Sequence, residues 1–376
     1  MPGLLSDIDP DGLFEFSVVF TDRSVNHMSQ QYQQVMNEIS STLKRVYNAE
    51  AVAVVPGGGT YGMEAVARQF ATGKKCLVVR NGFFSFRWTQ ILEMGSIASV
   101  HTVLKASRTS DAADAPFAPR AVDEVCATIR SERPQVVFAP HVETSAGILL
   151  PDDYISPVAD ATHEVGGLFV LDCIASGAMW VDMQSVGVDV LISAPQKGWS
   201  ASPCSALVML SDNARRAIDE TTSTSFSADL KKWLQIMEAY ESGGHAYHAT
   251  MPTDALIKFR DAMRETEAYG LEKLRSQQID LGARVRQLLS DIGIKSVAAE
   301  GFQAPGVIVS YTSDANVQTG KAFVEVGLQI AAGVPLQCDE GDDFRSFRLG
   351  LFGLEKLDNV DRTVKTLQEA LDKVCN

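Results

Sequence analysis

A single lysine, Lys197, lies between two apolar runs in the stretch VDVLISAPQKGWSASPCSALVML. Both runs are typical of interior strands, and lysines are almost never buried unless another group pairs with them. Asp172 raises the same question, because it directly follows the apolar run GLFVL. A buried carboxylate must be hydrogen-bonded or paired, although an aspartate after a strand is often only a turn or helix cap. A lysine nucleophile near a buried acid is therefore the first chemical candidate.

The stretch PGGGTYGMEA is a candidate phosphate cradle. Its glycines free the backbone N–H groups of Gly58, Gly59 and Thr60 to approach an anion where the next helix begins, and the helix dipole favours phosphate there. A plain tight turn explains a glycine triplet equally well. The stretch is not a P-loop, because no Gly-Lys-Ser/Thr follows.

Two further stretches supply an aromatic ring and hydroxyl groups. Phe84, in NGFFSFRW, can lie flat on a planar ligand or pack in the core, and HVETSAG offers the hydroxyls of Thr144 and Ser145. A phosphate cradle, an aromatic ring, a carboxylate and a lysine are the parts that pyridoxal phosphate (PLP) requires. The lysine forms a Schiff base, and the acid pairs with the pyridinium nitrogen.

The elements that position these residues alternate along the chain. Short apolar runs read as seven strands (EAVAVV, KCLVV, SIASVHTVL, PQVVFAP, GLFVLD, VDVLISA and CSALVML), separated by helical patterns. Such alternation predicts an α/β fold with a mostly parallel seven-stranded sheet between helices. Ligands bind beyond the carboxyl ends of such strands, which is where the candidate residues lie.

The pattern changes after YHATMPTDAL. A long charged helix pattern over residues 258–293 leads into the strands APGVIVSYT and FRSFRLGLFG and a closing helix, NVDRTVKTLQEALDKV. We therefore predict an N-terminal segment at 1–20, a large domain at 21–255 and a small α+β domain at 256–376.

Composition narrows the partners and the setting. The 376 residues carry a formal net charge of −14, which argues against nucleic acid and anionic lipid. No apolar run reaches membrane-spanning length, and the N-terminus lacks the basic and apolar regions of a signal peptide. The six cysteines form no C-x-x-C pair and read as small residues, mostly buried. We expect a cytoplasmic protein without a metal site.

Seven motifs in order, GGGT, NGFF, HVETSAG, LDCIASG, SAPQKG, YHAT and FRLG, resemble the class V aminotransferases of PLP fold type I. The likeness is to the alanine–glyoxylate / serine–pyruvate branch and runs from about residue 20 to the end. It implies that Lys197 is the Schiff-base lysine and that Asp172 is the pyridinium partner.

The resemblance also implies roles for the other motif residues. Gly58, Gly59, Thr60 and Gln196 would hold the phosphate. Phe84 and Ile174 would pack on opposite ring faces, and Thr144 would lie near the O3′ atom of PLP. Tyr247 and Thr250 would reach the phosphate of a neighbouring subunit, making a homodimer with composite sites. Arg348 would bind the substrate carboxylate through its planar fork, whereas without the family it reads as a solvent-facing strand residue.

Two departures from the family pattern concern the substrate. The family's N-terminal PGP loop is missing from DPDGLFEFSVVFTDRS, and Ala249 replaces the second histidine of the family's YHHT. Both changes lie where the family distinguishes substrate side chains. They therefore concern the identity of the substrate and not the fold or the cofactor.

The resemblance implies a transaminase that works by a ping-pong mechanism. We expect a small amino donor such as alanine or serine, and glyoxylate or pyruvate as acceptor. The reason is that the resemblance assigns one arginine, Arg348, to a carboxylate, and the other residues around the site are small or apolar. A 2-aminoethylphosphonate–pyruvate transaminase is the alternative within the class.

Other classes fit less well. Desulfurases and kynureninases typically carry histidine before the lysine, where this chain has Gln196. A regulatory PLP-fold module would be expected to lose Lys197 or Asp172. GGGTYG does not match the glycine pattern of nicotinamide dehydrogenases.

Overall fold

The structure is a computed structural model that describes residues 13–374. Most of the predicted N-terminal segment 1–20 therefore lies outside the described residues, as does Cys375. The five other cysteines are all buried thiols, as the apolar runs around most of them suggest.

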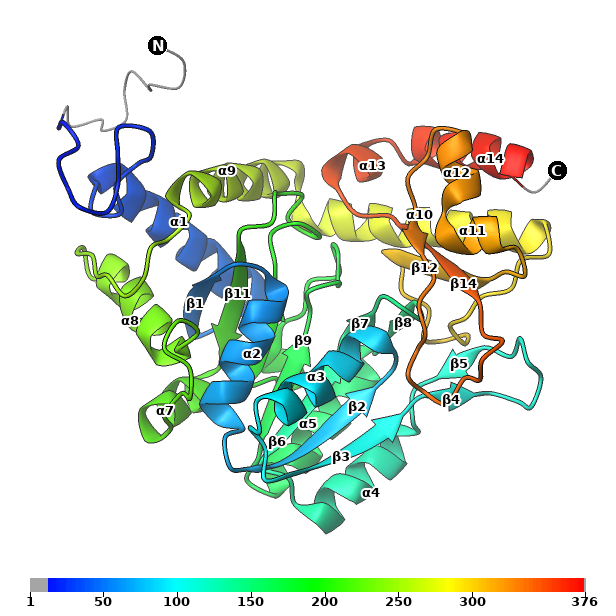
Figure 1. Ribbon diagram of the computed structural model, residues 1–376, viewed down its shortest axis with the longest axis horizontal. Coiled ribbons are helices and arrows are strands. Elements are labelled where there is room, and N and C mark those ends of the chain that lie inside the picture. The colour runs from blue at the N-terminus through cyan, green and yellow to red at the C-terminus, as the bar shows by residue number, and fades with distance from the viewer. Residues whose placement is uncertain (1–12, 375–376) are drawn as a thin grey trace.

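In the described part of the chain, a seven-stranded sheet in the order β1-β11-β10-β9-β6-β2-β3 forms the centre of the molecule (Figure 1). Its strands are β1 (Ala51–Pro56), β2 (Lys75–Arg80), β3 (Val100–Lys105), β6 (Val136–Pro140), β9 (Leu168–Asp172), β10 (Val190–Ser193) and β11 (Ser205–Leu210). Strand β11 is antiparallel to both its neighbours, and the other adjacent pairs are parallel. The predicted α/β class and mostly parallel sheet are confirmed.

Helices cover this sheet because each presents an apolar stripe to it. They are α1 (Gln30–Tyr47), α2 (Gly59–Phe70), α3 (Phe83–Met94), α4 (Val122–Glu132), α5 (Asp152–Glu164), α6 (Met183–Val186), α7 (Asp212–Glu220) and α8 (Leu230–Glu241). Trp88 of α3, for example, is fully buried and stacks on Phe138 of β6 with ring centroids 4.3 Å apart. Short ribbons, β4 (Ser107–Arg108) with β5 (Phe117–Ala118) and β7 (Val142–Glu143) with β8 (Ile148–Leu149), extend the strand ends.

The C-terminal part surrounds a smaller sheet in the order β12-β14-β13, which lies to the right in Figure 1. Its elements are β12 (Val307–Tyr311), β13 (Ala331–Ala332), β14 (Ser346–Gly350), α11 (Ala315–Thr319), α12 (Lys321–Glu325), α13 (Leu354–Asp358) and α14 (Val360–Val374). The two predicted strands and the closing helix are present in this part.

The long charged helix predicted over 258–293 is two helices. Helix α9 (Thr253–Tyr269) ends at Gly270, and α10 (Leu271–Asp291) begins directly after it. Gly270 has φ +105°, a backbone conformation that breaks the helix and that a residue with a side chain rarely adopts. The break went unpredicted because the charge pattern continues across it. The predicted domain boundary at residue 255 falls near the start of α9, and it stays a prediction.

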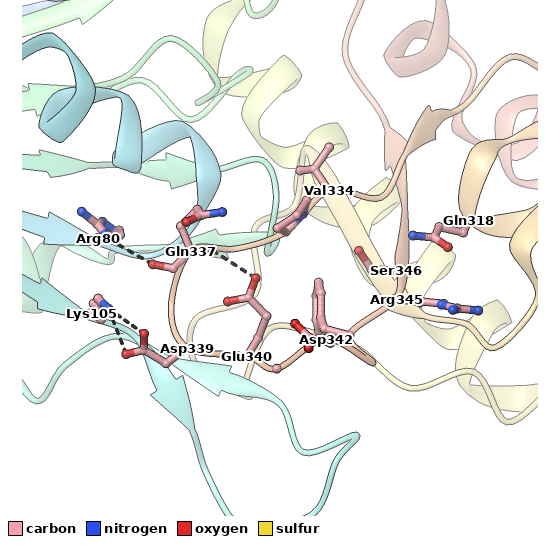
Figure 2. A pocket seen from close by; sticks show the side chains of 13 residues that line it. Arg80, Lys105, Gln318, Val334, Gln337, Asp339, Glu340, Asp342, Arg345 and Ser346 are labelled. Atoms are coloured by element: carbon pink, nitrogen blue, oxygen red, sulfur yellow. Dashed lines mark hydrogen bonds and ion pairs between the residues drawn. The ribbon is translucent and has the colours of Figure 1, made fainter. Parts of the chain in front are cut away.

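Segment 334–345, which connects β13 to β14 of the small sheet, contacts β2 and β3 of the large sheet (Figure 2). Arg80 of β2 donates to the carbonyl of Gln337 over 3.2 Å, and Lys105 of β3 pairs with Asp339 at 2.7 Å. A cavity of about 640 Å³ lies against this segment, lined by side chains of both charge signs. Its lining includes none of the predicted site residues. No helix within residues 13–374 combines the length and apolarity needed to cross a membrane.

Candidate active site

A cavity of about 170 Å³ brings most of the predicted site residues together at the strand ends. Its lining consists of Gly59, Thr60, Met63, Phe84, Arg87, Val142, Thr144, Asp172, Ile174, Ala175, Gln196 and Lys197. These residues come from the first turns of α2 and α3 and from the segments that follow β6, β9 and β10. The carboxyl ends of parallel strands therefore position the site, as the rule for open α/β sheets requires.

Lys197 lies in the turn that follows β10 and is half-buried. Its Nζ atom lies 5.0 Å from the centroid of the Phe352 ring, which comes from the C-terminal part of the chain. Burial lowers the pKa of Lys197, and the positive charges of Arg348 and Arg87 lower it further, while Asp172 opposes them. These effects shift Lys197 toward the neutral amine, which is the nucleophilic and proton-accepting form.

Asp172 is the last residue of β9 and is 8% exposed. Its carboxylate accepts a hydrogen bond of 3.0 Å from the backbone N–H of Ile174. Burial raises the pKa of Asp172 to about 7, and the charge of Glu143 adds to this effect. A cationic partner in the cavity would stabilise the ionised carboxylate and bring this pKa down.

The start of α2 has the features of an anion site. Gly58 is the N-cap, and the first helical residue, Gly59, lies so close to Ile174 that an added Cβ would be 2.5 Å from its Cδ1 atom. Only glycine lets the helix terminus approach the cavity wall this closely. The carbonyl oxygen of the Gln196 side chain, also at this cavity, is buried without a hydrogen-bond partner. A bound group that donates a hydrogen bond would satisfy this oxygen.

Glu143 is a structural residue of the site that the sequence analysis missed. Its fully buried carboxylate accepts hydrogen bonds from the backbone N–H groups of Phe84 and Ser85 at 3.1 and 2.8 Å. It also accepts from the N–H and hydroxyl of Ser145 at 3.0 and 2.8 Å. Glu143 thus anchors the first turn of α3 and fixes Phe84 at the cavity, while Ser145 is occupied in this network.

Arg87 is the second residue that the sequence analysis missed. It lies three residues after Phe84 on α3, so both side chains extend from the same face of the helix. Its guanidinium carbon lies 4.7 Å from the centroid of the Phe84 ring. Its position three residues after Phe84, an aromatic residue that follows a strand, is the sequence feature from which Arg87 could have been predicted.

Arg348 reaches the site from β14 of the small sheet. Its Nε donates to the carbonyl of Ala332 over 2.8 Å, and its guanidinium carbon lies 5.4 Å from the centroid of the Phe84 ring. The side chain is therefore directed toward the cavity region rather than away from the protein, and its role in binding a substrate carboxylate stays a prediction.

Tyr247 and Thr250 do not line the cavity of their own chain. They lie between α8 and α9, where Tyr247 is 53% exposed and its hydroxyl lies 3.1 Å from that of Thr250. The structure thus gathers eight predicted residues at the cavity wall, places Gly58 and Arg348 beside it, and leaves these two on the surface.

The comparisons with known proteins identify the family. The family described as "Aminotransferase class-V" matches residues 15–333. The chain belongs to the class V aminotransferases. As a member of this family it is a PLP-dependent transaminase, and the half-buried lysine, the buried aspartate and the glycine-led helix terminus fit that cofactor.

Similar aminotransferases match most of the chain. The alanine–glyoxylate aminotransferase of Rattus norvegicus is 25% identical, over 93% of this chain and 82% of its own length. The L-aspartate–glyoxylate aminotransferase of Paracoccus denitrificans is 24% identical, over 73% of this chain and 67% of its own length.

Solved structures share the fold. The crystal structure of alanine–glyoxylate aminotransferase from Nostoc sp. is 23% identical and has a TM-score of 0.76, covering 94% of this chain and 89% of that chain. Ureidoglycine–glyoxylate aminotransferase from Bacillus subtilis is 20% identical with a TM-score of 0.77, covering 92% and 86%. This aminotransferase therefore has PLP fold type I, as the resemblance implied.

Proposed function

We propose that this aminotransferase carries PLP covalently on Lys197 and moves an amino group from alanine or serine to glyoxylate or pyruvate by a ping-pong mechanism. The observation that carries the proposal is that Lys197 and Asp172 share one cavity with the start of α2. The names of similar proteins, alanine–glyoxylate aminotransferases among them, support the choice of substrates.

When bound, PLP supplies an aldehyde that condenses with amines and a ring that withdraws electrons from the substrate. Asp172 would hold the proton on the ring nitrogen, because a buried carboxylate with a single backbone donor is stabilised by a cationic partner. Phe84 and Ile174 would pack on the two faces of the ring, and Thr144 would donate to its oxygen substituent. Gly58, Gly59, Thr60 and Gln196 would bind the phosphate.

Lys197 would take the proton from the substrate Cα atom and deliver it to the C4′ carbon of the cofactor, and it would carry out the reverse transfer in the second half of the cycle. Its lowered pKa suits both tasks, because a neutral amine accepts a proton at neutral pH and the ammonium form then donates it. The charges of Arg348 and Arg87 contribute to that lowering.

Arg348 would bind the substrate carboxylate. Its Nε–H is already held by Ala332, which leaves the two terminal nitrogens of the guanidinium for a bidentate partner. A donor with one carboxylate satisfies this arginine, and the nearby Met63, Ile174 and Ala175 provide apolar walls for a small side chain. A glutamate side chain would bring a second charge at a cost of about 2 kcal/mol or more if unpaired.

A cysteine desulfurase is disfavoured by Cys338, the one cysteine near the small sheet among residues 13–374. Cys338 is buried, and burial raises its pKa to about 12. Its Sγ atom contacts the backbone carbonyl of Arg80 at 3.5 Å. A thiol held in this way stays protonated and is no nucleophile at neutral pH.

We further propose a cytoplasmic homodimer in which Tyr247 and Thr250 complete the phosphate site of the neighbouring subunit. The exposure of Tyr247 (53%) and of Phe226 (77%) supports this, because exposed aromatic side chains that gather on a surface are typical of a protein–protein contact. His248 lies against Phe226 with ring centroids 4.6 Å apart, which links the patch to the Tyr247 segment.

A half-reaction panel tests the proposed function. The purified holoenzyme would be mixed with alanine, serine, aspartate, glutamate or 2-aminoethylphosphonate, and the loss of the cofactor's visible absorbance recorded. We expect alanine and serine to convert the cofactor fastest, and glyoxylate or pyruvate to restore it. Fastest conversion by aspartate, glutamate or the phosphonate would replace the proposed donor, and no conversion by any amine would refute the transaminase cycle.

A further inference from the structure

Arg87 is a cation at the cavity to which the proposed function assigns no ligand. It lines the cavity together with Lys197. Its Nη1 atom donates to the hydroxyl oxygen of Thr60 over 3.1 Å. This bond directs the guanidinium to the first turn of α2, the helix whose start forms the proposed phosphate cradle.

Charge balance at that helix start calls for a cation. A helix N-terminus contributes only about half of a positive charge, whereas a phosphate monoester carries about −1.5 to −2 at neutral pH. Lys197 and Arg87 are the two cationic side chains in the lining of the cavity. Because Lys197 must be neutral to act as a base, Arg87 is the cation that remains for the phosphate.

The two arginines at the Phe84 ring are held at different places. Arg348 is bonded to Ala332 in β13, whereas Arg87 is bonded to Thr60 in α2. A ligand with a phosphate at the start of α2 and a carboxylate near β13 would therefore meet a separate guanidinium at each end. This separation distinguishes the task of Arg87 from that of Arg348.

We propose that Arg87 is a phosphate-binding residue of the cofactor site, donating from its guanidinium to the phosphate beside Thr60. The inference rests on the proposed function, since it presupposes PLP in this cavity. Arg87 would add a residue of α3 to those that bind the phosphate. The anion site at the start of α2 would then include a charged side chain as well as backbone N–H groups.

The test compares two ligands that differ only in the phosphate. The full-length protein, freed of cofactor, would be titrated with PLP and with pyridoxal, following the change in protein fluorescence. We expect Arg87→Met to weaken PLP binding by about ten- to hundredfold, the usual range for a charge-assisted hydrogen bond, and pyridoxal binding by less than about threefold. Arg68→Met is the matched control, because Arg68 lies on α2 but bonds to Glu64 and Thr224 instead.

Each outcome decides between roles. Equal weakening of both ligands would show that Arg87 acts by packing on Phe84, and unchanged binding with a raised donor KM would assign it to the substrate. Either result overturns the inference while leaving the proposed function intact, whereas a wild-type protein that does not bind PLP would refute the proposed function itself.

If Arg87→Met does not fold, Arg87→Lys replaces it in the same titration. Lysine keeps the positive charge but lacks the planar guanidinium, so the preference for PLP over pyridoxal should fall by about threefold or more. An unchanged preference would overturn the inference.

Discussion

At the residue scale, Asp172 combines a charge with nearly complete burial. The pKa of its carboxyl is raised from 3.8 to about 7 by burial in the protein without cofactor. Between about pH 3.8 and pH 7, the folded chain therefore keeps a proton on Asp172 that the unfolded chain has already released. Because the folded state binds more protons, the free energy of unfolding decreases as the pH rises through this window.

We accordingly expect the cofactor-free protein to lose roughly 2–3 kcal/mol of stability through Asp172 between about pH 5 and pH 8. Urea denaturation at the two pH values measures this loss. Asp172→Asn, which cannot ionise, should remove that share of the pH dependence while other groups titrate as before. Identical pH dependence in the two proteins would show that the pKa of Asp172 is not raised by burial.

Lys197 yields a chemical prediction. Borohydride reduction of the holoenzyme followed by peptide mapping should place the pyridoxyl group on Lys197. Lys197→Ala should give no such peptide and should lose about a thousandfold or more in turnover, because both the nucleophile and the proton carrier are gone. Lys105→Ala is the control, since that lysine pairs with Asp339 outside the cavity; label on any lysine other than Lys197 would contradict the assignment.

The sequence predicted the residues with a recognisable chemical type at a strand end and missed those that act through geometry. Lys197 and Asp172 stand out because charge interrupts an apolar run. Glu143 follows a strand too, yet its task depends on the start of α3, which is distant in sequence. In the sequence Arg348 looks like any arginine of a strand, and only the folded structure shows that the small sheet brings it close to Phe84. Only the family resemblance, not the pattern of the strand, pointed to it.

At the element scale, α2 positions the anion site through its close packing on β11. Gly62 lies against this strand, and an added Cβ would be 2.5 Å from the Cβ of Ala206. The helix and strand therefore approach more closely than a larger residue allows. Since the strand is fully buried, the helix would have to give way.

We expect Gly62→Ala to destabilise the protein by roughly 1–3 kcal/mol, because overpacking outweighs the gain of about 1 kcal/mol in helix propensity. Thermal unfolding followed by circular dichroism measures the effect, and PLP affinity should fall as the helix start shifts. Gly244→Ala is a control, because an added Cβ there meets only one carbonyl at 3.5 Å. An unchanged or raised melting temperature for Gly62→Ala would contradict this description of the packing.

The strands were easier to predict than the helix ends. Each of the seven apolar runs became a strand of the large sheet, because strands that are buried on both faces need continuous apolar sequence, and all but β3 are mostly buried. The break between α9 and α10 depends on one backbone angle at Gly270, and an isolated glycine in a helical pattern does not reveal that angle.

At the scale of the whole molecule, the proposed composite site predicts complementation between inactive subunits. Lys197→Ala and the double variant Tyr247→Phe/Thr250→Ala should each be nearly inactive. A mixed dimer would contain one site with all the lesions and one site with none, so random exchange should restore about a quarter of the wild-type activity. Activity and the fraction of mixed dimer, separated by an affinity tag, would be measured together; mixed dimers without activity would mean that the two residues are not shared.

Strand β1 forms the edge of the large sheet, and its partner in that sheet is β11, with Ala51 opposite Leu210. During synthesis on the ribosome, the run AVAVVP therefore emerges long before the strand that pairs with it. At about 5–20 residues per second, the wait is on the order of 10 s. Over that interval a fully apolar strand has no sheet neighbour, so the yield of active protein in the cell depends on α1 or a chaperone shielding β1 until β11 has been made.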